Sequence, residues 1–256
     1  MQSGCGLSPQ SREVLRVLEL AGLLILQNGG ETYRVEETVQ RMGEGFGYAD
    51  TRVVCMQTGF FISLGVDGDY QTLVRRVQRR STNLWRVDEV NRISRCVVQG
   101  TLNPAQTLEA LQKIACLPPL PVWLSTTLSG LAAGGFALML GADAGAFAAA
   151  AVSGAVIQLL AVALDRLELY LVLTHLLAGF ACAILVSMAH RWFGVSMEPA
   201  IAGALMPLLP GVAMTNAVRD TIRGDLLAGV TRGVEALLVA VLLAAGVVVG
   251  LWLGKA

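Results

Sequence analysis

Hydrophobic residues follow different patterns in the two halves of this 256-residue chain. Over residues 1–116 they recur at helical spacing or alternate with polar residues, which predicts amphipathic helices and short strands around one modest core. Over residues 122–256 they form five stretches of roughly 20 residues, each able to cross a hydrocarbon core about 30 Å thick. The pattern therefore predicts an α-helical membrane protein with five transmembrane helices, preceded by a small α+β cytosolic domain. Residues 117–121, rich in proline, are expected to form a stiff linker.

Local signals place the elements of the N-terminal domain. Ser8-Pro9 predicts the start of a helix and Gly29-Gly30 its end, while Asp67-Gly68 predicts a hairpin turn between two β-rich stretches. The other predicted elements are a helix from Thr32 to about Met42, two or three antiparallel strands over residues 52–66 and 70–77, a helix from about 81–83 to Gly100, and a helix that begins at Asn103-Pro104 and ends before Pro118.

Charge on the connections orients the predicted spans. The five spans are Pro121–Leu140, Gly145–Leu164, Leu167–His190, Pro199–Val218 and Gly233–Leu253. If the N-terminal domain is cytosolic, the basic residues of the outer connections are Arg191 and Lys255. Those of the inner connections are Arg166, Arg219, Arg223 and Arg232. This excess of inner arginines favours a cytosolic N-terminus and a C-terminus outside, an arrangement that requires an odd number of spans.

Composition excludes several classes of protein. The chain has 19 basic and 19 acidic side chains, so it is no strongly basic nucleic-acid binder, and its hydrophobicity excludes a disordered chain. It lacks a P-loop, a G-x-S-x-G motif and a convincing catalytic triad, so we expect no enzyme and no ATP-driven pump. Five cysteines without a C-x-x-C pair, and only two histidines, predict neither a disulfide framework nor a metal site. No cofactor is expected.

Small and polar residues within the spans carry further information. The first two spans are rich in Gly, Ala and Ser, which lets helix backbones approach closely. Gln158 and His175 lie at membrane depth, where buried polar groups cost free energy. His175 is a candidate for a substrate path or a proton relay, with a purely structural histidine as the alternative. Glu235, at the start of the fifth span, is a candidate for proton coupling or a side chain that snorkels to the interface.

The fourth span contains the most informative segment. Pro207, Pro210 and Gly211 fall within five residues, and they cannot all sit in a regular helix without loss of hydrogen bonds. Irregular backbone at membrane depth persists only when it is buried in protein or lines a hydrated cavity. A helix that restarts there has free amides that can hold a carboxylate. Asn216, Arg219 and Asp220 follow within three turns and could bring an amide, a cation and an anion to one mouth. The alternative is a proline kink followed by an ordinary loop.

Two motifs resemble the signatures of the threonine/serine exporter family. The first is Asn28-Gly29-Gly30-Glu31-Thr32-x-Arg34-Val35-Glu36, and the second comprises Pro210-Gly211, Asn216-Ala217, Asp220, Gly224-Asp225, Gly229 and Arg232. The resemblance covers nearly the whole chain. Within the family the chain is similar to the larger subunit of the split type, like the large component of two-part succinate exporters.

The resemblance implies an inner-membrane exporter of small carboxylate-bearing metabolites, such as succinate or threonine and serine. It also implies a second, smaller five-span partner subunit, with a homo-oligomer as a further expectation. We assign Pro210, Gly211, Asn216, Asp220, Arg232 and His175 to the substrate path and Asp220 and Glu235 to candidate proton coupling. Arg232 could equally anchor the topology. The alternative function is a membrane-tethered protein that senses a metabolite without transporting it.

A basic run in the N-terminal half has two interpretations. Its arginines are Arg75, Arg76, Arg79 and Arg80, with Arg86, Arg92 and Arg95 nearby. The run either binds anionic headgroups or an acidic metabolite, or it is a solvated face balanced by neighbouring carboxylates. The second interpretation is the simpler one.

Overall fold

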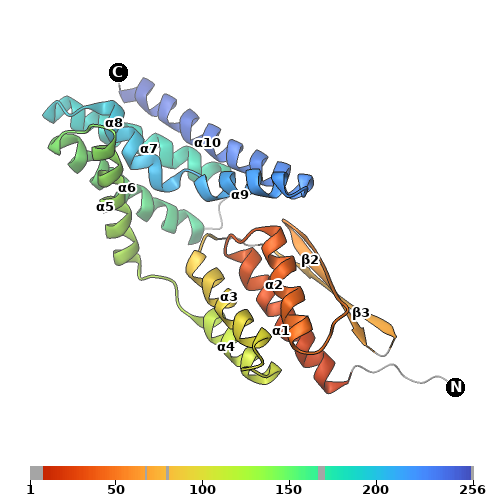
Figure 1. Ribbon diagram of the computed structural model, residues 1–256. Helices are drawn as coiled ribbons and strands as arrows, with labels where there is room; N and C mark the ends of the chain where they lie inside the picture. Colours follow the sequence, from red (N-terminus) through yellow and green to blue (C-terminus); the bar gives the residue numbers. More distant parts are fainter. Residues whose placement is uncertain (1–7, 67, 79–80, 167–170, 255–256) are drawn as a thin grey trace. The chain divides into compact units, whose positions relative to one another are not determined.

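The computed structural model describes residues 8–66, 68–78, 81–166 and 171–254 (Figure 1). The chain divides into two compact units. Unit 1 comprises Met1–Pro118 together with Val212–Gly233, and unit 2 comprises Pro119–Gly211 together with Val234–Ala256. Each unit is described separately below. Arg79 and Arg80 of the basic run lie outside the described residues.

Four helices of unit 1 begin or end where the sequence predicts. They are α1 (Pro9–Gln27), α2 (Thr32–Gly45), α3 (Leu84–Val98) and α4 (Pro104–Cys116). The Ser8 hydroxyl accepts a hydrogen bond from the Ser11 amide, and Asn103 forms a reciprocal capping box with Gln106. These side chains satisfy amides that would otherwise lack partners in the first turn of a helix.

In the described part of the chain, a three-stranded antiparallel sheet follows α2 and precedes α3 in sequence. Its strands are β1 (Thr51–Met56), β2 (Gly59–Val66) and β3 (Asp69–Arg76), in the order β1-β2-β3. Val66 pairs with Asp69, so the β2–β3 turn falls at the predicted hairpin position, where Gly68 has a φ of 89°. The other half of that turn signal, Asp67, lies outside the described residues.

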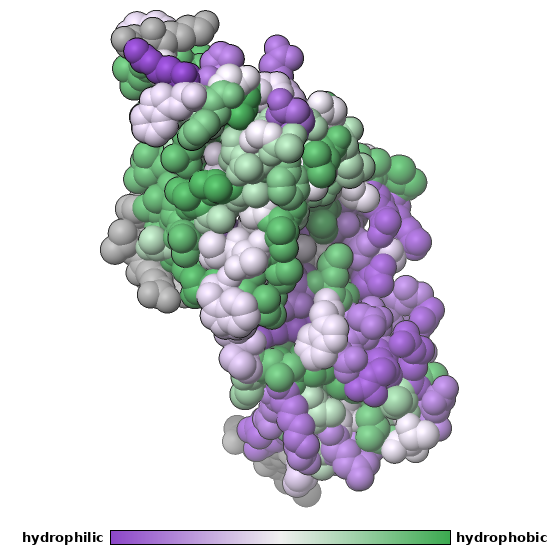
Figure 2. All heavy atoms as spheres, turned by 90° about the vertical axis from the view of Figure 1, so that its left-hand side faces the viewer, coloured by the Kyte–Doolittle hydropathy of each residue, from purple (hydrophilic) through white to green (hydrophobic). Residues whose placement is uncertain are grey.

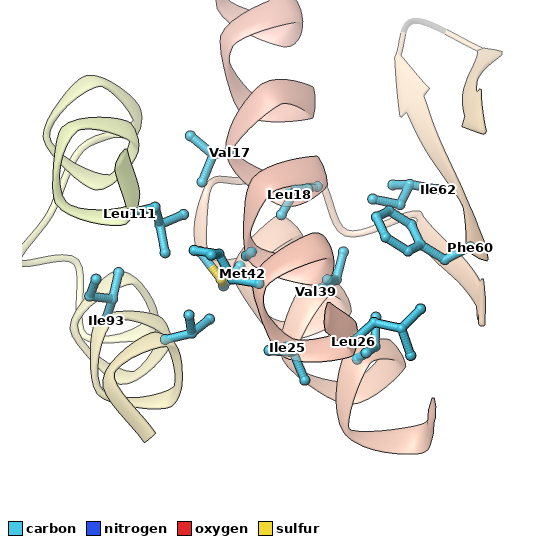
Figure 3. Close-up of a cluster of buried hydrophobic side chains, with 14 of the residues drawn as sticks. Val17, Leu18, Ile25, Leu26, Val39, Met42, Phe60, Ile62, Ile93 and Leu111 are labelled. Atoms are coloured by element: carbon cyan, nitrogen blue, oxygen red, sulfur yellow. The ribbon is translucent and has the colours of Figure 1, made fainter. Parts of the chain in front are cut away.

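The core of unit 1 forms around α1. Figure 3 shows Ile93 of α3 and Leu111 of α4 on one side of this cluster and Phe60 of β2 on the other, with side chains of α1 and α2 between them. Leu18 and Ile25 of α1 are fully buried. Burial of side chains of this size contributes roughly 1.5–3 kcal/mol each, so this core holds helices and sheet in fixed positions.

Two segments from the C-terminal half complete unit 1. They are α9 (Gly211–Ile222) after its first residue, and the first eight residues of α10 (Leu226–Gly254). The turn between them uses Gly224 at a φ of 91° and Asp225, whose side chain accepts a hydrogen bond from the Ala228 amide. A Cβ at Gly229 would lie 2.1 Å from Thr221 Oγ1, so α10 passes α9 at a distance that only glycine permits.

Unit 2 consists of membrane-length helices and one broken helix. Its elements are α5 (Val122–Met139), α6 (Ala144–Arg166), α7 (Leu171–Phe193), α8 (Met197–Leu205), the 3-10 turn η1 (Met206–Leu208) and the rest of α10. Among the described residues four helices, α5, α6, α7 and α10, are long and apolar enough to cross a membrane. The number becomes five if α8–η1 and α9 count as one bent span, so the count of five stays a prediction.

Small residues bring the helices of unit 2 together. An added Cβ at Gly130 of α5 would lie 2.7 Å from the carbonyl oxygen of Ala151 in α6, and one at Gly246 of α10 would lie 2.1 Å from that of Leu176 in α7. Gln158 donates a hydrogen bond of 2.9 Å to Ser125 Oγ, which satisfies a polar group between two apolar helices. In Figure 2 most of the visible surface of unit 2 is hydrophobic, as a lipid-facing surface requires.

Candidate functional site: a polar cluster that joins two motifs

The α1–α2 connection exposes backbone carbonyls at a fixed place in unit 1. Asn28 ends α1 and donates its side-chain amide to the carbonyl of Leu24 at 2.7 Å. Gly29 then adopts a φ of 88°, and a Cβ on Gly30 would lie 2.4 Å from Ile25 Cγ2. Gly29 is therefore required by its backbone conformation, and Gly30 is required by packing. Their carbonyl oxygens face the second motif.

One face of α9 meets this connection. Asn216 and Asp220 are four residues apart, so both lie on the same face of the helix, and both are buried. Asn216 Nδ2 donates to the Gly29 carbonyl at 2.9 Å, and Thr32 Oγ1 donates to Asp220 Oδ1 at 3.3 Å. These contacts join residues that are 187 and 188 positions apart in the chain.

A buried ion pair links α9 to the start of α10. Arg232 Nε lies 3.4 Å from Asp220 Oδ2, and the two side chains are 8% and 0% exposed. Arg232 also donates through Nη2 to the Gly30 carbonyl at 3.4 Å. Within the described residues, Arg232 Nε and Asp220 Oδ2 each lack a hydrogen-bond partner. The two charges compensate each other electrostatically, but the pair leaves one donor and one acceptor unused.

Glu31 lies at the edge of the same site and binds two arginines. Its carboxylate accepts a hydrogen bond from Arg34 Nε at 2.8 Å and pairs with Arg219 Nη1 of α9. Burial by itself would raise the pKa of Glu31, but its own backbone amide and the two guanidinium groups outweigh burial and lower this pKa. Glu31 is therefore ionised at neutral pH. We call the group formed by Gly29, Gly30, Glu31, Thr32, Asn216, Arg219, Asp220 and Arg232 the polar cluster.

Two neighbouring groups of unit 1 have weakened acidity. Glu36 accepts a hydrogen bond from the Cys55 amide at 2.8 Å, and burial together with Asp225 raises the pKa of its carboxyl. Burial, reinforced by Glu36, also raises the pKa of the Cys55 thiol, which makes Cys55 an inert core cysteine. Within the described ranges, no group of three or more His, Cys, Asp and Glu side chains is arranged to hold a metal ion.

The structure brings together three of the predicted site residues, namely Asn216, Asp220 and Arg232. Pro210 and Gly211 stand at the break before α9, where the backbone is not helical at Leu209-Pro210. His175 of α7 and Glu235 of α10 are partly buried in unit 2. The assignment of these residues to a substrate path stays a prediction.

The sequence pattern did not indicate that Glu31 and Thr32 belong to the site. It placed Arg219 near Asn216 and Asp220 and among the inner positive charges, but the carboxylate partner of Arg219 was not identified. The available signal was the first motif, because Glu31 and Thr32 follow its two glycines directly. Pattern alone could not show that this motif and the second one form a single site.

Comparison with known proteins agrees with the two motifs. The family model of threonine/serine exporters (ThrE) matches residues 16–254. A protein of Mycobacterium tuberculosis named a probable threonine/serine exporter is 28% identical over 245 residues, which cover 94% of this chain and 45% of that protein. The chain thus spans less than half the length of this relative.

Two shorter relatives match over nearly their whole length. Proteins of Escherichia coli and Klebsiella aerogenes, each named a probable succinate transporter subunit YjjP, are 27% and 26% identical over 250 residues. The match covers 94% of this chain in both cases, and 95% and 94% of the two relatives. No solved structure matches the chain.

The family match extends over both motifs and over the membrane-length helices found among the described residues. The apolar helices identify an integral membrane protein, and the family consists of transporters rather than enzymes. The chain belongs to the threonine/serine exporter family.

Proposed function

We propose that the chain is the larger subunit of a two-part exporter of small carboxylate-bearing metabolites in the bacterial inner membrane. The observation that carries the proposal is the buried Asp220–Arg232 pair with its unused donor and acceptor. A cation kept in place by a neighbouring carboxylate, but not fully hydrogen-bonded by it, can accept a second carboxylate.

In this proposal the substrate carboxylate takes the place of Asp220 at Arg232. A guanidinium presents a planar set of donors that matches a carboxylate, and Nε is the donor that lacks a hydrogen bond within the described residues. The Gly30 carbonyl, which accepts from Nη2 at 3.4 Å, keeps the arginine in position during the exchange. The Asn216 amide is engaged by the Gly29 carbonyl and orients α9.

Proton coupling follows from charge balance. When the substrate takes Arg232, a buried Asp220 anion would lose its compensating charge, and a buried unpaired charge costs several kcal/mol. Asp220 therefore takes up a proton as substrate binds and returns it when substrate leaves. Glu235 and His175 are alternative candidates for proton uptake, because both are partly buried ionisable side chains in membrane helices.

The break before α9 supplies the remaining part of the proposed path. Pro210 ends the preceding segment and Gly211 begins α9, whose first amides point toward its N-terminal end. Such an end favours an anionic group. Asp220 lies nine residues, or about 13 Å, further along α9, so this end would hold the substrate at a separate point of the path. We place the N-terminus in the cytosol and the C-terminus outside, because the inner connections carry more arginines.

A partner subunit is part of the proposal because of the names of the relatives. The YjjP proteins, which match 94% of this chain, are named probable succinate transporter subunits. The mycobacterial relative is about twice as long as the matched region. A second five-span chain would therefore supply what the longer relative carries in one polypeptide, as paired halves do in many transporters.

The test uses proteoliposomes that contain the chain with a co-expressed five-span partner. They are loaded with labelled succinate or threonine, and efflux is measured with and without a pH gradient. Wild-type protein should export one of the two, and the chain without its partner should not. Asp220→Asn should lose the effect of the pH gradient but retain exchange between internal and external substrate, because its side chain cannot release a proton.

Asp165→Asn is the matched control, because Asp165 is an exposed carboxylate at the end of α6. It should behave like wild type. Normal gradient-driven efflux in Asp220→Asn would contradict the proposed coupling. Absence of efflux in correctly inserted wild-type pairs, with either substrate, would instead favour the metabolite-sensing alternative.

A further inference from the structure

Unit 1 contains a second polar site, separate from the polar cluster. It is a cavity of about 320 Å3 between α2, α3 and the α9–α10 turn. Its described lining includes one carboxylate, Glu37, and four arginines, namely Arg34 and Arg41 from α2, Arg95 from α3 and Arg223 from the turn. The volume is at the small end of the range for ligand pockets, which is about 300–1,000 Å3.

Two of these arginines have carboxylate partners. Arg34 pairs with Glu31 at 2.8 Å, and Arg41 pairs with Glu37 one turn earlier on the same helix. Arg95 and Arg223 have no ion-pair partner in the part of the chain that the structure describes. The cavity therefore has a local surplus of two positive charges that face the same space.

Neighbouring side chains hold this surface in place. The guanidinium of Arg223 stacks 4.1 Å above the ring centre of Tyr33, which restricts its orientation. Thr38 Oγ1 donates to Asn91 Oδ1 at 3.4 Å, and this leaves the Asn91 amide hydrogens without a partner within the described residues. Ser94 Oγ donates a hydrogen bond to the Asn91 backbone carbonyl at 2.9 Å. The lining thus presents one oriented cation, Arg223, a second cation, Arg95, and an amide donor that lacks a partner within the described residues.

We propose that this cavity binds a small soluble dianion, a dicarboxylate or a phosphate-bearing metabolite. Arg95 and Arg223 each contact one end of the anion or share a phosphate group, since planar guanidinium groups match both carboxylate and phosphate oxygens. The Asn91 amide donates the neutral hydrogen bond. Arg75 of the basic run pairs with Glu19 and does not line the cavity, whereas Arg95, which was grouped with that run, does.

Occupation of the cavity would act on the polar cluster through two short connections. Tyr33 and Arg34 follow Glu31 and Thr32 directly, and Arg223 begins the turn that follows α9. An anion that holds α2, α3 and this turn together restrains the elements that position the polar cluster. The site is thus suited to regulation by a cytosolic metabolite. The binding proposal does not depend on the proposed export function.

The test is isothermal titration of the full chain in phosphatidylcholine nanodiscs, with inorganic phosphate and succinate as probes. Threonine, a zwitterion, serves as the comparison ligand. We expect one phosphate per chain and, for succinate, one cavity site besides any site at Arg232. Binding at the cavity site should be weakened roughly tenfold by Arg95→Gln or Arg223→Gln through loss of a charge-assisted hydrogen bond, while Arg232→Gln should leave phosphate binding unchanged. Arg92→Gln is the matched control, because Arg92 is on the same helix as Arg95, pairs with Glu89 and does not line the cavity.

Three results would overturn the proposal. The first is no binding of either anion by the wild-type chain. The second is equal weakening in Arg92→Gln, which would indicate general surface electrostatics. The third is loss of phosphate binding when phosphatidylglycerol is added to the nanodiscs, which would assign the cavity to a lipid headgroup. Arg95 and Arg223 are exposed, so their variants are expected to fold, and a thermal melt of each verifies this.

Discussion

Arg232 Nε and Asp220 Oδ2 lie 3.4 Å apart in a buried ion pair in which neither atom makes a hydrogen bond within the described residues. The two residues belong to helices that follow each other across a three-residue turn, so the pair is held by the α9–α10 hairpin itself. The same pair is contacted by Gly30 and Thr32 from the other end of the chain. Its charge state therefore affects both motifs at once.

The pair predicts strongly non-additive mutant effects. Arg232→Gln or Asp220→Leu alone should lower the free energy of unfolding of unit 1 by about 3–5 kcal/mol, because each leaves one buried charge without compensation. The double variant Asp220→Leu/Arg232→Met should be less destabilised than either single variant. Thermal unfolding in detergent measures all three. Additive losses in the double variant would show that the two charges do not interact.

The approach of α10 to α9 predicts a position-specific effect of one methyl group. Gly229→Ala should destabilise the protein by about 1–3 kcal/mol, because its Cβ would lie 2.1 Å from Thr221 Oγ1 and 2.9 Å from the Ala217 carbonyl oxygen. Gly233→Ala, one turn later, meets only the Ala217 Cβ at 3.8 Å. It should be neutral or stabilising by up to about 1 kcal/mol, since alanine favours a helix. Equal unfolding temperatures for the two variants would contradict this packing.

A similar comparison applies to unit 2. Gly246→Ala should loosen the contact of α10 with α7, because its Cβ would lie 2.1 Å from the Leu176 carbonyl and 2.8 Å from the Phe180 amide. Backbone atoms cannot move aside cheaply, so we expect a loss of about 1–3 kcal/mol. Gly135→Ala of α5 is the control, since no described atom outside the local helix backbone lies within 4 Å of its added Cβ. Unfolding temperatures in dodecyl maltoside compare the two, and a stable Gly246→Ala would refute close contact here.

We expect Glu31 to contribute to the free energy of unfolding in a way that depends on pH. Its pKa in the folded protein is lowered from the ordinary value of 4.5 by its backbone amide, Arg34 and Arg219. A group with a lowered pKa stabilises the folded state above its unfolded pKa, and this contribution is lost as pH falls through the folded value. Wild type should therefore exceed Glu31→Gln in stability at pH 7, and the difference should shrink below about pH 4.5. A difference that stays constant from pH 7 to pH 3.5 would argue against the ion pairs.

Local features were predictable because their causes are local. Ser8-Pro9 and Asn103-Pro104 begin helices as predicted, since a cap needs only its own side chain and the next three amides. Asp67-Gly68 predicted the position of the β2–β3 turn. The apolar stretches likewise correspond to α5, α6, α7 and α10, because span length depends only on composition and helix rise.

The break between α8 and α9 was only partly predictable. Pro207, Pro210 and Gly211 predict an interruption, and the chain indeed passes from α8 through η1 to α9 with two non-helical residues between them. Sequence pattern could not show what α9 contacts afterwards. Its buried residues Asn216 and Asp220 meet the α1–α2 connection of unit 1. Contacts between residues 187 or 188 positions apart leave no periodic trace in the sequence.

The sequence by itself determined the helix ends, the hairpin, the membrane-length helices and the two motifs, since each depends on a few neighbouring residues or on summed hydrophobicity. Only the tertiary structure decided that the two motifs form one site, that Arg219 pairs with Glu31 and that four arginines line one cavity. These features arise when side chains from distant segments pack around a common core. Their energies depend on distance and burial in three dimensions, which the order of residues does not display.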